Sequence, residues 1–204
     1  MLAAASRNLD NPVMPLTLAD VRLETPRLVL RELALEDVPA VQRWATDPEV
    51  YRYMPWGPNT MGQSAEFLRT ALAARREEPR RTFELGFARK ESGELIGAGG
   101  CRIRSTVHLE GDIGYVLRRD AWGNGYATEG AAALVEFGIR VLGLHRIWAT
   151  CHVDNARSAR VLERIGMQRE GRLRDHVRAR GAWRDSYLYA AIDGDGGLRS
   201  VLIG

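Results

Sequence analysis

The chain contains very little cysteine. Cys101 and Cys151 are the only two in 204 residues, which excludes a disulfide framework and a cysteine-rich zinc site. The four histidines show no H-x-x-x-H spacing, so we expect no bound metal. So few cysteines are typical of a reducing compartment, and we therefore expect a cytoplasmic location.

Long apolar segments are also missing from the sequence. No run approaches the ~18–20 residues that a membrane-spanning helix needs, so we expect no membrane partner. The first six residues, Met1 to Ser6, hold too short an apolar stretch for a signal peptide, and no basic residue precedes it. The remaining composition, 45% hydrophobic and 27% charged residues, is that of a globular protein.

Lysine is nearly absent from the basic residues. Lys and Arg together number 29 against 26 Asp and Glu, and Lys90 is the only lysine. This bias is explained either by the codon usage of a GC-rich genome or by a need for guanidinium groups that bind phosphate. The arginines are scattered among acidic residues and form no run, so we expect no nucleic-acid partner.

Hydrophobic periodicity predicts about four helices and about seven strands. Apolar residues at helical spacing indicate the helices, and Asp47-Pro48 is expected to end the first of them. Short apolar runs bounded by turn residues indicate the strands. The expected helices cover residues 35–46, 63–77, 127–142 and 156–165, and the expected strands cover a segment between Pro26 and Leu33 and residues 82–89, 95–103, 111–117, 145–151, 167–178 and 183–192.

This order of elements predicts one α/β (α+β) domain. Antiparallel hairpins come early, and a strand–helix–strand unit lies in the middle of the chain. We expect the domain to span residues 20–192, with an N-terminal arm over 1–19 and a weakly determined tail over 193–204. The arm carries several large apolar side chains, so we expect it to pack across a partner subunit in a homodimer.

The most informative segment is a strand, a glycine-bearing loop and a helix start. Gly123 and Gly125 remove side chains where a ligand could approach the backbone, and Ala127 leaves the helix start uncluttered. The free N–H groups and the positive dipole end of a helix suit an anion such as pyrophosphate. The alternative is that these glycines only make a tight turn. The segment matches neither a P-loop nor a dinucleotide fingerprint.

The run Gly123-Asn-Gly-Tyr-Ala127 resembles the acetyl-CoA loop of the GNAT superfamily of N-acetyltransferases. Trp122 stands where Gln or Arg is usual, a departure shared by the ribosomal-protein N-terminal acetyltransferase (RimJ/RimL-like) branch. Residues 154–167 resemble the family's Asn-x-x-Ser helix, and residues 181–188 resemble its final hairpin. The resemblance extends from Thr25 to Tyr189, most of the chain.

The resemblance implies a fold and a co-substrate. The fold would be a mixed, mostly antiparallel twisted sheet with a V-shaped gap between its fourth and fifth strands. Acetyl-CoA (CoA) would lie there, with its pantetheine arm along the fourth strand and its pyrophosphate on the helix start. The residues implied to bind it are Val116, Leu117, Trp122, Gly123, Asn124, Gly125, Tyr126, Ala127, Thr128 and Asn155.

The resemblance also suggests two catalytic residues. Ser158 would give a proton to the leaving thiolate, although it could equally be an exposed helix serine. Asp112 would serve as the base, although it could instead be a strand-end carboxylate in a salt bridge. Removing a proton at pH 7 costs about 1.4 kcal/mol for an α-amine of pKa ~8 and about 4.6 kcal/mol for a lysine. Nothing near Cys151 marks it as a nucleophile, so we expect direct transfer.

The acceptor site is the least determined part. Tyr51, Met54, Trp56 and Asp185 are the candidate substrate-binding residues, although the aromatic group could be core under a loop. The expected acceptor is a primary amine, either a protein N-terminus or a small molecule. The alternative function is a CoA-binding sensor or assembly module without turnover.

Overall fold

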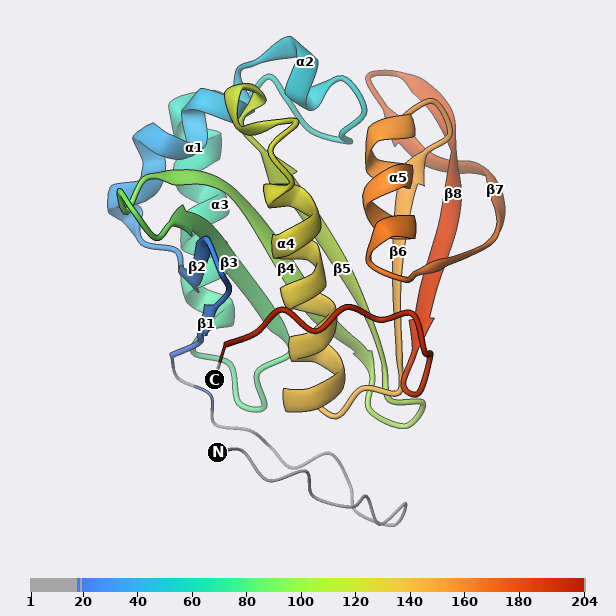
Figure 1. Cartoon of the computed structure of the whole chain (residues 1–204). Coiled ribbons are helices and arrows are strands. Elements are labelled where there is room, and N and C mark those ends of the chain that lie inside the picture. Colours follow the sequence, from blue (N-terminus) through green and yellow to red (C-terminus); the bar gives the residue numbers. More distant parts are fainter. Residues whose placement is uncertain (1–17, 19, 204) are drawn as a thin grey trace.

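The computed structural model describes residue 18 and residues 20–203, and these residues form one mixed sheet. It has eight strands in the order β1-β2-β3-β4-β5-β6-β8-β7, and every neighbouring pair is antiparallel except the parallel pair β5 and β6 (Figure 1). The strands are β1 (Arg22–Glu24), β2 (Leu28–Glu32), β3 (Thr82–Arg89), β4 (Leu95–Ser105), β5 (Glu110–Leu117), β6 (Arg146–His152), β7 (Gln168–Ala179) and β8 (Ala182–Ile192).

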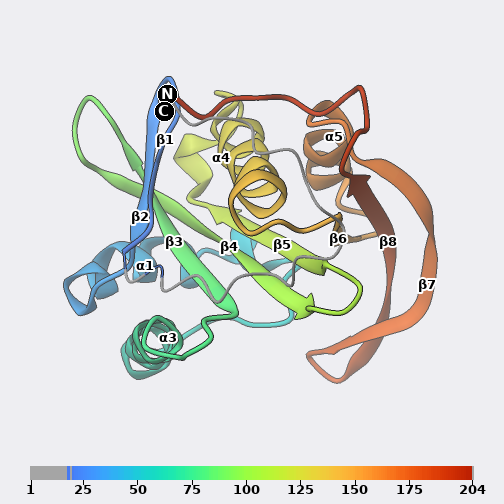
Figure 2. The same ribbon diagram turned by 90° about the horizontal axis from the view of Figure 1, so that it is seen from below.

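Helices cover both faces of the sheet. Figure 2 shows α4 and α5 on one face and α1 and α3 on the other. A π-helical turn, Phe137–Val141, continues α4. The α-helices of the described chain are α1 (Val38–Ala45), α2 (Pro48–Tyr51), α3 (Met61–Ala74), α4 (Tyr126–Glu136) and α5 (Ala156–Arg164).

Side chains alternate between the two faces of each strand, so the sheet has a hydrophobic core on each face. Phe83 and Leu85 of β3 belong to the larger buried cluster, which also contains Leu134 of α4. Trp44 of α1 and Leu68 of α3 belong to a smaller cluster on the opposite face. Burying each such side chain stabilises the fold by about 1.5–3 kcal/mol. Residue 84, between Phe83 and Leu85, therefore faces the α1/α3 side.

The sheet opens between β5 and β6. These strands pair only over Glu110–Asp112 and Arg146–Trp148. Past that point β5 continues beside β4 and β6 continues beside β8, so the two strands diverge. The expected single α/β domain, with a gap beside the 111–117 strand, is confirmed.

Two elements differ from the sequence prediction. The expected first strand is preceded by a separate one, β1, which pairs antiparallel with β2 after a turn that contains Pro26. Pro48 does not merely terminate α1: it is the first residue of α2, where Asp47 caps the helix by accepting the Glu49 N–H at 3.0 Å. Proline suits that position because the first helical N–H needs no partner.

The C-terminal segment is part of the packed domain. The Glu136 carboxylate at the end of α4 accepts hydrogen bonds from the Ser200 hydroxyl and the N–H groups of Val201 and Leu202, at 2.7–3.0 Å. The Ile203 N–H donates to the Glu24 carbonyl of β1 at 2.8 Å. The segment expected to be weakly determined therefore fastens α4 to β1.

Most of the predicted N-terminal arm lies outside the described residues, which omit 1–17 and 19. Leu18 is described and packs against the larger cluster. The homodimer that the arm suggested stays a prediction. None of the helices in residues 20–203 is long and apolar enough to cross a bilayer. The same residues contain no group of three or more His, Cys, Asp or Glu placed to hold a metal ion.

Candidate active site

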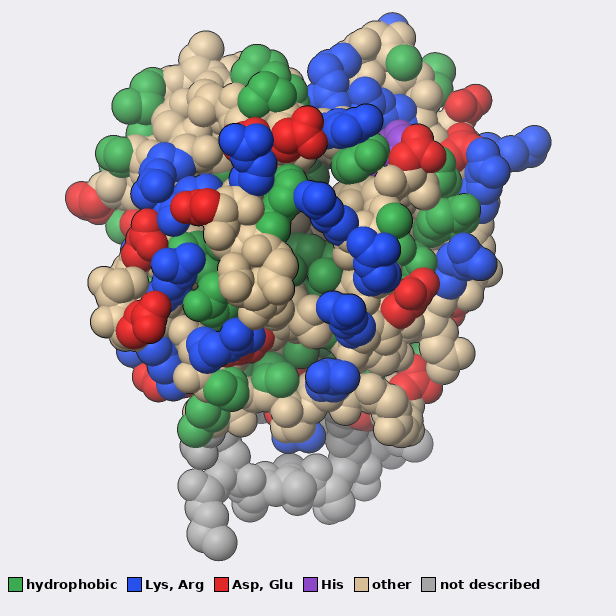
Figure 3. All heavy atoms as spheres, turned by 45° about the horizontal axis from the view of Figure 1, so that its top comes forward, with side chains coloured by type: hydrophobic (Ala, Val, Ile, Leu, Met, Phe, Trp, Pro, Cys, Tyr) green, Lys and Arg blue, Asp and Glu red, His purple; other side chains and the backbone are tan. Residues whose placement is uncertain are grey.

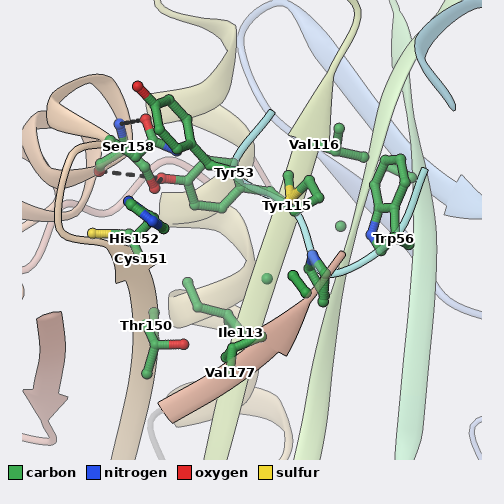
Figure 4. Close-up of a pocket in the computed structure, with 18 of the residues that line it drawn as sticks. Tyr53, Trp56, Ile113, Tyr115, Val116, Thr150, Cys151, His152, Ser158 and Val177 are labelled. Carbon is green, nitrogen blue, oxygen red and sulfur yellow. Dashed lines mark hydrogen bonds between the residues drawn. The ribbon is translucent and has the colours of Figure 1, made fainter. Parts of the chain in front are cut away.

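A cavity of about 490 Å³ occupies the gap and reaches both faces of the sheet. Figure 4 shows Tyr115 and Val116 of β5 on one side of it and Thr150 to His152 of β6 on the other. From the α4/α5 face it is lined by Asn155, Ser158 and Leu162, and from the α1/α3 face, which we call the acceptor side, by Val41, Trp44, Phe67, Glu84, Ala98 and Arg102.

The glycine loop, residues 122–128, lies at the start of α4. Gly123 and Gly125 have φ of +81° and +82°, a conformation that side-chain-bearing residues rarely adopt. Within the described chain, the N–H groups of residues 123–128 donate to no other residue. These free donors and the helix dipole are suited to an anion. In Figure 3, Lys and Arg side chains gather beside a hollow on this face.

Neighbouring side chains hold the glycine loop in place. The Trp122 indole N–H donates to the Leu117 carbonyl at 3.0 Å, and the Arg157 guanidinium of α5 lies 4.8 Å above the indole ring. Arg27 donates to the Asn124 carbonyl at 2.8 Å. The Trp122 contacts therefore join β5, the loop and α5 at the mouth of the gap.

Two further predicted loop residues have structural contacts. The ring of Tyr126 lies 4.7 Å from the Arg27 guanidinium and 5.5 Å from that of Arg89. The Asn124 side-chain amide donates to the Trp122 carbonyl at 3.1 Å. These contacts orient the Tyr126 ring and the Asn124 side chain.

Asn155 begins α5 and lines the cavity. Its side-chain oxygen accepts the Ser158 N–H at 3.1 Å, which caps the helix. Its side-chain NH₂ has no acceptor among the described residues, so one end of the amide caps the helix and the other is free. The capping and the ligand-binding interpretations of Asn155 are therefore compatible.

Ser158 and Tyr115 form a hydroxyl pair. Their oxygens lie 2.9 Å apart, and both residues line the cavity. Burial raises the pKa of Tyr115 although its hydrogen bond with Ser158 opposes the shift, so the phenol is neutral at physiological pH. Ser158 was predicted from the sequence as a proton donor, whereas only the fold brings Tyr115 to it.

Cys151 and His152 also line the cavity. Burial raises the pKa of Cys151 to about 11, so its thiol is neutral and a weak nucleophile at neutral pH. Burial lowers the pKa of His152. The His152 Nδ1 accepts the Asp154 N–H at 3.1 Å, which places the ring proton on Nε2.

Asp112 lies in the paired part of β5 and does not line the cavity. One carboxylate oxygen accepts from Arg102 Nη1 at 2.9 Å, and the other accepts from Arg104 Nε. Both carboxylate oxygens of Asp112 are therefore occupied by guanidinium groups, away from the cavity. This placement favours the salt-bridge interpretation of Asp112.

Sequence analysis missed the carboxylate that does line the cavity, Glu84 of β3. Its Oε1 accepts from Arg102 Nη2 at 2.6 Å. Burial raises the pKa of Glu84 because it penalises the charged form, although Arg102 opposes the shift. The only signal was a single acid within an alternating apolar strand, Phe83-Glu84-Leu85.

The predicted acceptor residues divide into two groups. Met54 and Trp56 line the cavity, whereas Tyr51 and Asp185 do not. Asp185 instead accepts from Arg172 Nε at 2.7 Å and from the Asp175 N–H at 2.9 Å, which braces an irregular part of β7.

Tyr51 helps to close the acceptor side. Its carbonyl accepts from Arg180 at 3.3 Å, and the same guanidinium donates to the Arg52 carbonyl at 2.8 Å. Arg184 also donates to the Arg52 carbonyl, at 3.0 Å. The β7–β8 hairpin is thereby tied to the loop that carries Met54 and Trp56.

The chain is similar to known proteins over most of its length. An N-acetyltransferase from Bacillus licheniformis, named p20, is 33% identical over 171 residues, which cover 83% of this chain and 95% of that protein. The [ribosomal protein uS5]-alanine N-acetyltransferase of Escherichia coli is 28% identical over 184 residues, covering 83% and 90%. The solved structure of Mycobacterium smegmatis RimJ in complex with CoA-disulfide has a TM-score of 0.72 and 25% identity, covering 85% and 86%.

The family profile described as the acetyltransferase (GNAT) domain matches residues 27–168. The match includes the glycine loop, both strands that border the gap and the start of α5. It therefore covers the elements that form the cavity except β7 and β8, which contribute Val177 and Arg184. The chain belongs to the GNAT acetyltransferase family, as a RimJ-like N-acetyltransferase.

Proposed function

We propose that this enzyme transfers an acetyl group from acetyl-CoA directly to a primary amine, and that the two substrates enter from opposite faces of the sheet. The observation that carries the proposal is the cavity that passes through the gap between β5 and β6. GNAT acetyltransferases use acetyl-CoA, and the similar M. smegmatis structure contains a CoA derivative.

The glycine loop and its surroundings fit the phosphate groups of CoA. The N–H groups of residues 123–128 would hold the pyrophosphate, with Arg157 nearby on α5. Past Asp112, the edge of β5 that faces the gap has no strand partner within the described residues. Val116 and Leu117 lie on that segment, which could pair with the pantetheine amides as an added strand. The free NH₂ of Asn155 would also bind this arm.

Tyr115 and Ser158 would supply the leaving-group proton. The amine nitrogen forms a bond to the thioester carbonyl carbon, the carbon–sulfur bond breaks, and its electron pair stays on sulfur. The hydroxyl pair then gives a proton to that sulfur. The nitrogen releases its own proton to water, from which the hydroxyl pair regains a proton. A neutral thiol near the site, Cys151, gives no support for an acyl-enzyme.

An N-terminal α-amine is the acceptor that we favour. The E. coli relative is named for an alanine of ribosomal protein uS5. An α-amine also needs less help to lose its proton than a lysine does, by about 3 kcal/mol at pH 7. A small-molecule amine remains the second acceptor class.

An acetyl-CoA consumption assay tests this function. Purified protein is incubated with acetyl-CoA and, separately, with peptides that begin with alanine or serine, a lysine side-chain peptide and an aminoglycoside. We expect CoA release only with a primary amine, and faster release with the N-terminal peptides. Binding of CoA without release in any arm would instead support the sensor alternative.

A further inference from the structure

Glu84 is a carboxylate on the acceptor side of the cavity. Strand register places Glu84 of β3 opposite Gly100 of β4, and Gly100 opposite Gly114 of β5. A Cβ built on Gly100 would lie 2.6–2.8 Å from the Glu84 carboxyl atoms. The Glu84 side chain therefore extends across Gly100, toward the strand that borders the gap, and a larger residue at 100 would displace it.

The hydrogen bonds distinguish Glu84 from Asp112. Both oxygens of Asp112 accept from arginines, Arg102 and Arg104. Glu84 Oε1 also accepts from Arg102, but no donor in residues 20–203 reaches its Oε2. The Glu84 side chain keeps 13% of its surface exposed, and the residue lines the cavity. Glu84 thus has a free carboxylate oxygen facing the space where an acceptor would lie.

The surrounding charges allow Glu84 to gain a proton. Arg102 is shared between Glu84 and Asp112, and Arg104 adds a second positive charge beside Asp112. If Glu84 gains a proton, Arg102 still forms its ion pair with Asp112. Arg184 of β8 and His152 of β6 also line the cavity, and neither is hydrogen-bonded to Glu84. Burial already favours the protonated form of Glu84.

The two proton-transfer groups lie on opposite faces of the sheet. Tyr115 belongs with the larger cluster on the α4/α5 face, and it contacts Ser158. Glu84 and Gly114 lie on the acceptor side, because strand alternation places them opposite Phe83 and Tyr115. A thioester in the gap would have a proton donor on one side and a proton acceptor on the other.

Given the proposed acetyl transfer, we infer that Glu84 binds the ammonium group of the acceptor and takes its proton, so that the neutral amine can attack. The proton moves from nitrogen to Glu84 Oε2, and the freed electron pair forms the bond to the carbonyl carbon. The acceptor is a primary amine on an apolar body, because the other residues at this end are mainly apolar or aromatic: Val41, Trp44, Tyr53, Met54, Trp56 and Phe67.

Binding measurements test the ammonium site without turnover. Protein saturated with CoA is titrated with phenethylamine and alaninamide, and with their neutral counterparts 2-phenylethanol and propionamide. We expect each amine to bind wild type at least tenfold more tightly than its counterpart, and Glu84→Gln to abolish that difference. Glu84→Asp tests whether a carboxylate on a shorter side chain still reaches the ammonium group. Glu110→Gln is the control, since Glu110 is a β5 carboxylate outside the cavity.

Rates of acetyl transfer distinguish a failure of the role of Glu84 from a failure of the proposed function. Glu84→Gln should lower kcat/KM for an N-terminal peptide by ~10²–10⁴-fold. Its pH profile should then follow only the deprotonation of the free amine. CoA affinity should be unchanged. An inactive wild type that cannot bind CoA would refute the proposed function. An active enzyme in which Glu84→Gln keeps its amine selectivity and rate would refute the role of Glu84 alone.

Discussion

The hydroxyl oxygens of Tyr115 and Ser158 lie 2.9 Å apart, joining β5 to α5 across the cavity. The two residues are 43 positions apart in the chain, and no charged group of residues 20–203 lies within hydrogen-bond distance of either hydroxyl. A hydroxyl near another hydroxyl can pass a proton onward without either becoming an ion. We therefore propose that the pair acts as one proton donor.

Removing either hydroxyl should slow acetyl transfer. Ser158→Ala and Tyr115→Phe should each reduce kcat, by up to ~10²–10⁴-fold for the group that directly faces sulfur, because the proton is needed as negative charge develops there. CoA affinity, measured by calorimetry, should remain within about threefold of wild type. If the double variant loses no more than the worse single variant, the two hydroxyls act together; full activity in both singles would exclude them as acids.

The glycine loop offers a matched pair of substitutions. Gly125 and Gly143 both have positive φ, +82° and +70°, but only Gly125 lies in the loop at the start of α4. Valine at either site should cost about 1–2 kcal/mol of stability from backbone strain. Only Gly125→Val should lower CoA affinity, by tenfold or more, as measured by calorimetry. Equal affinities in the two variants would mean that the loop does not hold the ligand.

Both thiols should resist alkylation in the native protein. Burial raises the pKa of Cys151 to about 11 and that of Cys101 to about 12, so only a very small fraction is thiolate at pH 7.5. Labelling followed by mass spectrometry should be slow in buffer, faster as the pH rises and complete in urea. Acetyl-CoA should leave no acetyl group on Cys151. A stable acetyl-cysteine at that position would contradict direct transfer.

Glu129 should stabilise the fold in a pH-dependent way. Burial alone would raise its pKa, but hydrogen bonds from Thr25 and Arg27 outweigh it, and the net pKa is lowered from 4.5. Because the folded pKa is depressed, the contribution is complete above about pH 4.5 and is lost as the pH falls through the folded value. Glu129→Gln should cost about 1–3 kcal/mol at pH 7, measured by urea unfolding.

The pH dependence of the stability lost in Glu129→Gln is the control. The difference in unfolding free energy between wild type and Glu129→Gln should shrink as the pH is lowered below 4.5, the ordinary value for this carboxyl. Glu66→Gln removes a carboxylate that forms an exposed ion pair with Arg69, so it should change stability by less than about 0.5 kcal/mol. A difference that stays constant with pH would show that shape rather than charge matters at position 129.

Much of the fold could be predicted from the sequence because local signals were strong. Apolar runs joined by a turn identified β3 and β4, and helical spacing after Gly123 and Gly125 identified the start of α4. These signals depend on neighbours within a few residues. The missed elements, β1 and α2, are only three and four residues long, too short to show a period.

The catalytic surroundings were decided by tertiary structure. Asp112 and Glu84 look alike in sequence, each an acid in an apolar strand. Register gives Asp112 two arginine partners at the closed end of the gap, whereas it lays Glu84 across Gly100 with one oxygen free. Asp185 likewise became a brace for β7. The sequence by itself determined most of the elements and the glycine loop. Only the pairing of distant strands determined which carboxylate faces the cavity, because a side chain's partners depend on cross-strand neighbours.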